Sequence, residues 1–295
     1  MDHPVDQVPA PVRSSSTAEE PSRPSPGCGC GCGASPSHNG AAAPSYVYAI
    51  GVIEARFSSL GAEKEFSQVT SRSNNSGKTD RQTLHTVLSQ PENRYLARQI
   101  CWVFTIQGLE TYILHPRDPR DLDRLVEAIR PDPTPLDLDV IIGVRGPIAP
   151  PAMCNGLQAP IVVFDQIYSF DRNALLKALP RPPKSGKQFD AAAEEVLERV
   201  LRVTDNAGST REHIAFNYLA VRYPGVYEKT AEEFAKDFSL SAVEARPAPV
   251  QGTRDIVEAV FSYTSRTTDF TEKFSVRVDV TEEFPFLVTK LAPCF

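Results

Sequence analysis

Ordered structure is expected to begin at SYVYAIGVIEARF, residues 45–57. Val47 and Ala49 alternate with Tyr48 and Ile50, and apolar residues continue beyond them. This pattern is typical of a strand that is buried over most of its surface.

The preceding residues 1–45 have a different composition from the rest of the chain. They contain no Phe, Tyr, Trp, Leu or Ile, and they hold eight of the 26 prolines. Such a segment cannot bury enough apolar surface to offset the entropy lost on ordering. We therefore predict a disordered tail, rich in Pro, Ser, Gly and Cys, over residues 1–45.

The segment that follows residue 57 alternates helical and strand patterns. Gly108 favours a hairpin between two apolar runs, and Asp118 with Pro119 is typical of a helix start. Helices are predicted at residues 62–72, 79–89, 92–99, 117–131 and 171–179, and strands at residues 99–106, 111–116, 138–148 and 160–170.

The last third of the chain begins with helical patterns and ends with strand patterns. Helices are predicted at residues 189–203 and 209–223, the second opening with a capping box from Ser209 to Glu212. Four alternating runs, at residues 240–246, 254–266, 272–281 and 284–291, predict an antiparallel meander. We therefore predict an α+β fold of two packed lobes with antiparallel sheets and flanking helices, over residues 46–180 and 188–295.

Charge and hydropathy exclude several classes of protein. The formal net charge is −6 and no block of Lys and Arg occurs, which argues against nucleic acid as a partner. No run approaches the roughly 20 apolar residues that cross a bilayer, and the N-terminus lacks a targeting pattern. These features predict a cytoplasmic protein without a membrane segment, and its six cysteines are expected to be reduced thiols.

Many ordered segments of the chain resemble one known family. The segments are PSYVYAIGVIEARF, AEKEFSQ, RYLARQICWVFTIQGLETYIL, DVIIGVRGPIAPPAMCNG, VFDQIYSFD, FNYLAVRYP and VRVDVTEEFPFLVTKL. Together, over about residues 44–295, they resemble the C-terminal region, a domain of unknown function, of PatG-type cyanobactin maturation proteases. The resemblance implies a place in ribosomal peptide maturation. Serine protease activity is not carried over, because the subtilisin motifs HGT and GTSxA do not occur in this sequence.

The heptapeptide GCGCGCG, residues 27–33, is the first candidate site. Cys28, Cys30 and Cys32, together with His38, supply the soft ligands that a tetrahedral zinc ion prefers. Single-residue spacing is unusual for zinc, however, so a solvated flexible tether is the simpler interpretation. A third hypothesis is that the tail mimics a Cys-rich peptide substrate of a thiazoline-forming enzyme.

Cys154, in the loop MCNG, is the best candidate for a nucleophilic thiol. A cysteine nucleophile needs a base, and His85, His115 and His213 are the histidines of the predicted folded part. None is adjacent in sequence, and a lone cysteine is more often a small buried apolar residue. The neighbouring acids Glu282 and Glu283 are interpreted as a solvated edge.

Arg145 and Asp165 are the candidate peptide-binding residues. Arg145 stands between glycines at the end of an apolar strand, where its guanidinium can reach a carboxylate. Asp165 begins DQIYSFD, which we expect to form a wall of the same groove. The alternative for Arg145 is an exposed charge at a strand end. The alternative for the aromatic residues of DQIYSFD is a place in the core.

These observations favour a non-catalytic accessory or recognition module that binds a precursor peptide or a subtilisin-like protease or modifying enzyme of the same pathway. The expected site is a groove between the lobes, near Arg145 and the MCNG loop, with no cofactor other than zinc on the Cys/Gly tail. One alternative is a cysteine- or metal-dependent enzyme acting on a modified peptide. Another is a structural domain that forms a homodimer.

Overall fold

The computed structural model describes residues 45–72, 77–178, 186–203, 205–248 and 253–294. The predicted tail 1–45 lies outside the described residues except for Ser45, and so do Cys28, Cys30, Cys32 and His38. The predicted boundary between the lobes also lies largely outside them, so the division into lobes 46–180 and 188–295 stays a prediction.

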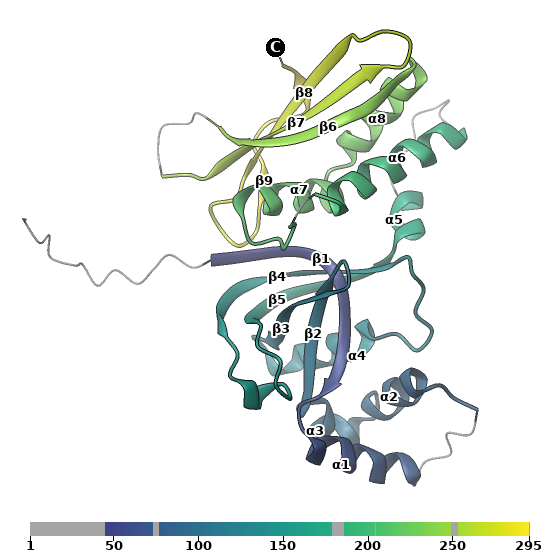
Figure 1. Cartoon of the computed structure of the whole chain (residues 1–295), viewed down its shortest axis with the longest axis vertical. Coiled ribbons are helices and arrows are strands. Elements are labelled where there is room, and N and C mark those ends of the chain that lie inside the picture. Colours follow the sequence, from purple (N-terminus) through teal and green to yellow (C-terminus); the bar gives the residue numbers. More distant parts are fainter. Residues whose placement is uncertain (1–44, 73–76, 179–185, 204, 249–252, 295) are drawn as a thin grey trace, which may run out of the picture. The chain divides into compact units, whose positions relative to one another are not determined.

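The first half of the described chain forms a closed barrel (Figure 1). Its strands are β1 (Ser45–Phe57), β2 (Ile100–Ile106), β3 (Leu109–Pro116), β4 (Asp137–Ile148) and β5 (Pro160–Asp171). They pair in the order β1-β2-β3-β5-β4, and β4 returns to β1. All pairs are antiparallel except β3 with β5, which is parallel.

Gly51 allows β1 to close the barrel. Residues 45–51 of β1 pair with β4, whereas residues 52–57 pair with β2. A Cβ atom on Gly51 would lie 2.4 Å from the Thr105 carbonyl oxygen and 2.8 Å from the Phe104 ring. The strand therefore changes partner at a position where only a hydrogen fits.

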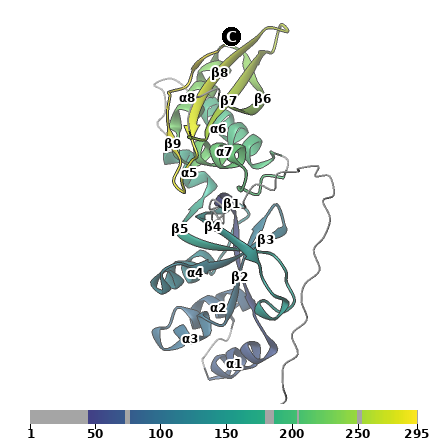
Figure 2. The ribbon, with the colours of Figure 1, turned by 90° about the vertical axis from the view of Figure 1, so that its left-hand side faces the viewer.

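Short helices gather at one end of the barrel (Figures 1 and 2). They are α1 (Leu60–Ser71), α2 (Asp80–Leu88), α3 (Arg94–Ala97) and α4 (Leu122–Ala128). A capping box between Thr79 and Gln82 starts α2. The helix predicted at residues 92–99 is instead a 3-10 turn at Pro91–Asn93 followed by α3, and the one predicted at 117–131 is a 3-10 turn at Pro119–Asp121 followed by α4.

Helices and a second sheet follow the barrel. The helices are α5 (Arg172–Ala178), α6 (Gly186–Leu201), α7 (Arg211–Arg222) and α8 (Pro224–Ala235). The strands are β6 (Phe238–Pro247), β7 (Ile256–Ser265), β8 (Thr271–Asp279), β9 (Phe286–Leu287) and β10 (Ala292–Pro293). Helices α6, α7 and α8 contact β6 or β7, and Figure 1 shows them along one face of the sheet.

The predicted meander is confirmed for β6, β7 and β8, which pair in sequence order. Two details were predicted wrongly. The N-cap of α7 is Thr210, whose hydroxyl accepts from the His213 amide, so Ser209 is not the cap. The strand predicted at residues 284–291 is reduced to the two-residue β9, and α8 was not predicted.

Both faces of β1 and β4 are buried. Val47, Ala49 and Ile141 belong to the core inside the barrel, and Tyr48 and Ile142 belong to a second core that includes α6, α7 and the second sheet. The alternation in residues 46–50 is thus the alternation between two cores, whereas Glu54 and Arg56 beyond Gly51 belong to neither. The described residues confirm the predicted α+β class with two antiparallel-rich sheets.

Candidate functional site

Arg145 and Asp165 lie on neighbouring strands of the barrel wall. Arg145 on β4 is exposed and stands between Ser45 on β1 and Val162 on β5 in the strand register. Both edges of β4 are therefore already paired, and a peptide cannot add to it as an extra strand. Among the described residues, no contact joins Arg145 to Asp165.

Asp165 is the extra residue of a β-bulge. Ile142 faces Gln166 and the next residue, Gly143, faces Phe164, so Asp165 has no partner on β4. One carboxylate oxygen lies 2.6 Å from the Arg117 Nε atom. The bulge turns this carboxylate toward Arg117 and toward the segment that precedes β9.

Glu283 in that segment contacts the Asp165 carboxyl group, and the expectation of a solvated edge was wrong for it. Burial and the neighbouring Asp165 raise the pKa of Glu283 to about 7. Burial acts to raise the pKa of Asp165 as well, but hydrogen bonds with Arg117 and Glu283 lower it below its ordinary value. Below about pH 7 the pair of carboxyl groups therefore holds one proton.

Cys154 is bonded to Cys101 in a disulfide, with 5.4 Å between the two Cα atoms. The expectation that all thiols are reduced is therefore wrong for this pair in the structure. Both residues are buried. A disulfide sulfur carries no thiolate, so Cys154 has no nucleophilic role in this state, and the catalytic interpretation stays a prediction for a reduced form alone.

The zinc prediction stays untested because Cys28, Cys30, Cys32 and His38 lie outside the described residues. Within the part of the chain that the structure describes, no group of three or more His, Cys, Asp and Glu side chains is arranged to hold a metal ion. The described helices likewise include none that is long and apolar enough to span a membrane.

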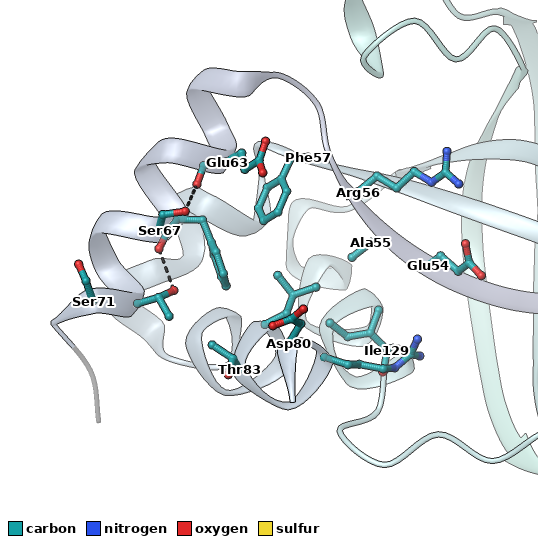
Figure 3. Close-up of a pocket in the computed structure, with 14 residues that line it drawn as sticks. Glu54, Ala55, Arg56, Phe57, Glu63, Ser67, Ser71, Asp80, Thr83 and Ile129 are labelled. Atoms are coloured by element: carbon teal, nitrogen blue, oxygen red, sulfur yellow. Dashed lines mark hydrogen bonds between the residues drawn. The ribbon is translucent and has the colours of Figure 1, made fainter. Parts of the chain in front are cut away.

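A cavity of about 690 Å³ lies between the end of β1 and the helices α1 and α2 (Figure 3). We call it the α1–α2 cavity. Phe57 and Phe66 line it, with ring centroids 5.3 Å apart and planes tilted by 50°. Its other apolar lining residues are Ala55, Leu84 and Ile129.

Three carboxylates and two arginines line the α1–α2 cavity. Glu54, Glu63 and Asp80 line it and have no ion-pair partner among the described residues. Arg56 pairs with Glu110 outside the cavity. Arg81 donates through Nε to the carbonyl oxygens at the end of α4, at 2.5 Å from Ile129 and 3.0 Å from Arg130.

The two cavity carboxylates on the helices lie where helix geometry favours negative charge. Glu63 lies in the first turn of α1 and Asp80 in the first turn of α2. The positive end of a helix dipole stabilises a carboxylate in that turn. Figure 3 shows Glu63 and Asp80 facing the cavity from the two helices, with Phe57 nearby. The result is an aromatic cavity with a negative rim.

Sequence reasoning missed this cavity because its residues come from three separate elements. Phe57 ends a strand, Phe66 lies on one helix, and Leu84 lies on the next. Phe66 and Val69 form a short apolar stripe on an otherwise polar helix, and that stripe was the available signal.

Comparisons with known proteins agree with the resemblance in the sequence. Residues 183–293 match the PatG C-terminal family. The match spans α6 through β10, so it covers the second sheet and the helices α6 to α8. A search of curated proteins finds no match.

The likeness to a solved structure extends over the barrel as well. A solved structure described as "PatG Domain of Unknown Function" superposes with a TM-score of 0.69 at 18% sequence identity, covering 85% of this chain and 98% of that one. The resemblance to the PatG region is thus confirmed, and the chain shares the fold of this PatG domain of unknown function. At this identity the likeness shows the fold alone.

Proposed function

We propose that this PatG-type domain is a non-catalytic recognition module that binds a peptide segment in the α1–α2 cavity. The observation that carries the proposal is the combination of an aromatic lining with three unpaired carboxylates. A cavity of this size and lining accommodates one or two side chains of a peptide.

The apolar part of the cavity favours a large side chain of the bound segment. Phe57, Phe66 and Leu84 are all partly buried, so each keeps surface that a ligand can cover. Covering apolar surface contributes roughly 25 cal/mol per Å² before the entropic cost of association is subtracted. A leucine or phenylalanine side chain of the peptide suits this lining.

The carboxylates select the charge of the segment. Glu54, Glu63 and Asp80 attract a cation, so a lysine or arginine next to the apolar anchor is favoured and an acidic residue there is disfavoured. The proposed ligand is therefore a segment in which a large apolar residue adjoins a basic one. This replaces the groove near Arg145 as the proposed site.

The resemblance to the PatG region supports particular sources for this segment. We propose a precursor peptide of a ribosomal peptide pathway, or a partner protease or modifying enzyme of that pathway, as the protein that carries it. The fold likeness supports testing these proteins as partners. Within each of them, the chemistry of the cavity favours segments in which a large apolar residue adjoins a basic one.

The test is calorimetric titration of the full chain with short blocked peptides that contain Phe-Lys or Phe-Glu at the same position. The Phe-Lys peptide is expected to bind more tightly. Phe66→Ala should weaken its binding by about tenfold or more, because the ligand loses an aromatic contact. The matched control is Phe270→Ala, which removes an exposed phenylalanine that does not line the cavity.

Two results would contradict the proposal. One is equal affinity of the Phe-Lys and Phe-Glu peptides for the wild-type chain. The other is equal binding of the Phe-Lys peptide by wild type and by a Phe66→Ala variant whose melting temperature shows that it is folded.

A further inference from the structure

A separate cavity of about 330 Å³ lies between the outer face of the barrel and α7. Tyr48 on β1, Tyr168 on β5, and Tyr218 and Arg222 on α7 line it, together with Phe284. It shares no lining residue with the α1–α2 cavity. What it binds is therefore a question independent of the function proposed above.

Arg222 supplies a positive charge that has no acidic partner in the described part of the chain. Its guanidinium carbon lies 4.4 Å from the centroid of the Tyr168 ring, so the planar group rests on an aromatic face. The side chain is exposed at the cavity. A guanidinium held in this way keeps its N–H donors available for an anion.

The hydroxyl of Tyr48 is the second polar group of the cavity. Tyr48 is 2% exposed, and its hydroxyl oxygen makes no hydrogen bond of normal geometry with the residues that the structure describes. Leaving a buried hydroxyl without a partner costs about 1 to 3 kcal/mol. Burial raises the pKa of this phenol, whereas the charge of Arg222 and a hydrogen bond from its guanidinium to the phenol oxygen act to lower it. The hydroxyl therefore stays protonated beside the guanidinium, and its own O–H has no acceptor among the described residues.

The nearby acids do not neutralise Arg222. Glu282 accepts a hydrogen bond from the Tyr46 hydroxyl at 3.3 Å, and Glu283 contacts Asp165. Both glutamates precede Phe284, yet their described partners lie on the barrel rather than on α7. The cavity therefore combines one available cation with one available neutral donor.

We propose that this cavity binds a carboxylate attached to a planar apolar group. The carboxylate would accept hydrogen bonds from the Arg222 guanidinium and from the Tyr48 hydroxyl, which gives the buried O–H an acceptor. The rings of Tyr168, Tyr218 and Phe284 would contact the planar group. A free aromatic acid and the C-terminal phenylalanine of a peptide share this chemistry.

The experiment uses phenylacetate and phenylacetamide as probes, titrated into the full chain by calorimetry. Phenylacetate is expected to bind at least about tenfold more tightly, since a charged acceptor forms the stronger hydrogen bonds. Arg222→Gln and Tyr48→Phe should each weaken phenylacetate binding by about tenfold. The control is Arg266→Gln, which removes an arginine stacked on Phe234, away from the cavity.

A second pair of probes distinguishes the source of the ligand. Acetyl-Gly-Phe with a free C-terminus is compared with its amide and with phenylacetate. Tighter binding of the free peptide identifies a peptide C-terminus, and tighter binding of phenylacetate identifies a small acid; both results support the site. Equal affinity of acid and amide, or undiminished phenylacetate binding by both a folded Arg222→Gln and a folded Tyr48→Phe variant, would overturn the proposal.

Discussion

Asn217 on α7 donates a hydrogen bond from its side-chain amide to the backbone carbonyl of Tyr48 on β1, at 2.8 Å. Asn217 is 1% exposed, and its amide also exchanges hydrogen bonds with the amide of Asn206. The Tyr48 amide nitrogen donates in turn to the Gly208 carbonyl. The backbone carbonyl of Tyr48 is thus bonded to α7, and its backbone amide is bonded to the segment that leads into α7.

Asn217→Ala should destabilise the domain by about 1 to 3 kcal/mol, because the Tyr48 carbonyl and the Asn206 amide lose buried partners. Chemical denaturation of wild type and variant measures the difference. Asn173→Ala, at an exposed position on α5, serves as the control. Equal stability of Asn217→Ala and wild type would contradict the importance of this junction.

Gly51→Ala should destabilise the barrel by about 1 to 3 kcal/mol, because the added methyl group meets the Thr105 carbonyl and the Phe104 ring. Gly146→Ala is a matched control on β4, since its Cβ would come no closer than 3.5 Å to a neighbour. Thermal or chemical denaturation compares the two. Similar losses for both variants would show that the partner switch does not depend on Gly51.

The shared proton of Asp165 and Glu283 predicts a pH dependence of stability. The pKa of Glu283 rises from 4.5 to about 7 on folding, so the folded state holds a proton that the unfolded state releases. The contribution of this proton to the free energy of unfolding is fully present below pH 4.5 and is lost as the pH rises through about 7. The free energy of unfolding should therefore fall with rising pH across this window.

Glu283→Gln isolates that effect, because an amide cannot ionise. Subtracting the variant's pH profile from that of wild type removes contributions from other groups with shifted pKa values, such as Asp139 and His213. The difference should change between about pH 4.5 and 7 and be flat above that window, whereas at lower pH Asp165, whose pKa Glu283 lowers, also contributes. Parallel profiles across the window would contradict the shared proton.

The Cys101–Cys154 disulfide closes a loop with a sequence separation of 53 residues. Reducing it should lower the free energy of unfolding by about 2 to 4 kcal/mol, chiefly through the unfolded chain. The double variant Cys101→Ala, Cys154→Ala should be insensitive to the same reductant. Thiol labelling of unfolded, unreduced protein, followed by peptide mapping, checks that the disulfide is present. Modification of Cys101 or Cys154 by the label would rule out the bond.

Local patterns predicted the elements better than their pairing. The alternation in residues 45–57 indicated a buried strand, and Gly108 indicated the hairpin that joins β2 to β3. Barrel closure could not be predicted, because it depends on β1 pairing with two strands that are distant in sequence. Helix α8 had one signal, Pro224 at its first position, but its apolar stripe is interrupted.

The sites were harder to predict than the fold. Arg145 was chosen for its glycine neighbours and stays a prediction, whereas the aromatic partner of Arg222 and the buried hydroxyl beside it gave no local signal. Asp165 was identified, but its partner Glu283 lies 118 residues further along the chain. Such pairings arise from tertiary packing, which leaves no pattern in the local sequence.

The most direct test of the central claim, peptide recognition by the negative α1–α2 cavity, is a charge-reversal titration. The double variant Glu63→Lys, Asp80→Lys is titrated with the Phe-Lys and Phe-Glu peptides beside wild type. Wild type is expected to prefer Phe-Lys and the folded double variant to prefer Phe-Glu. An unchanged preference in the double variant would contradict this claim.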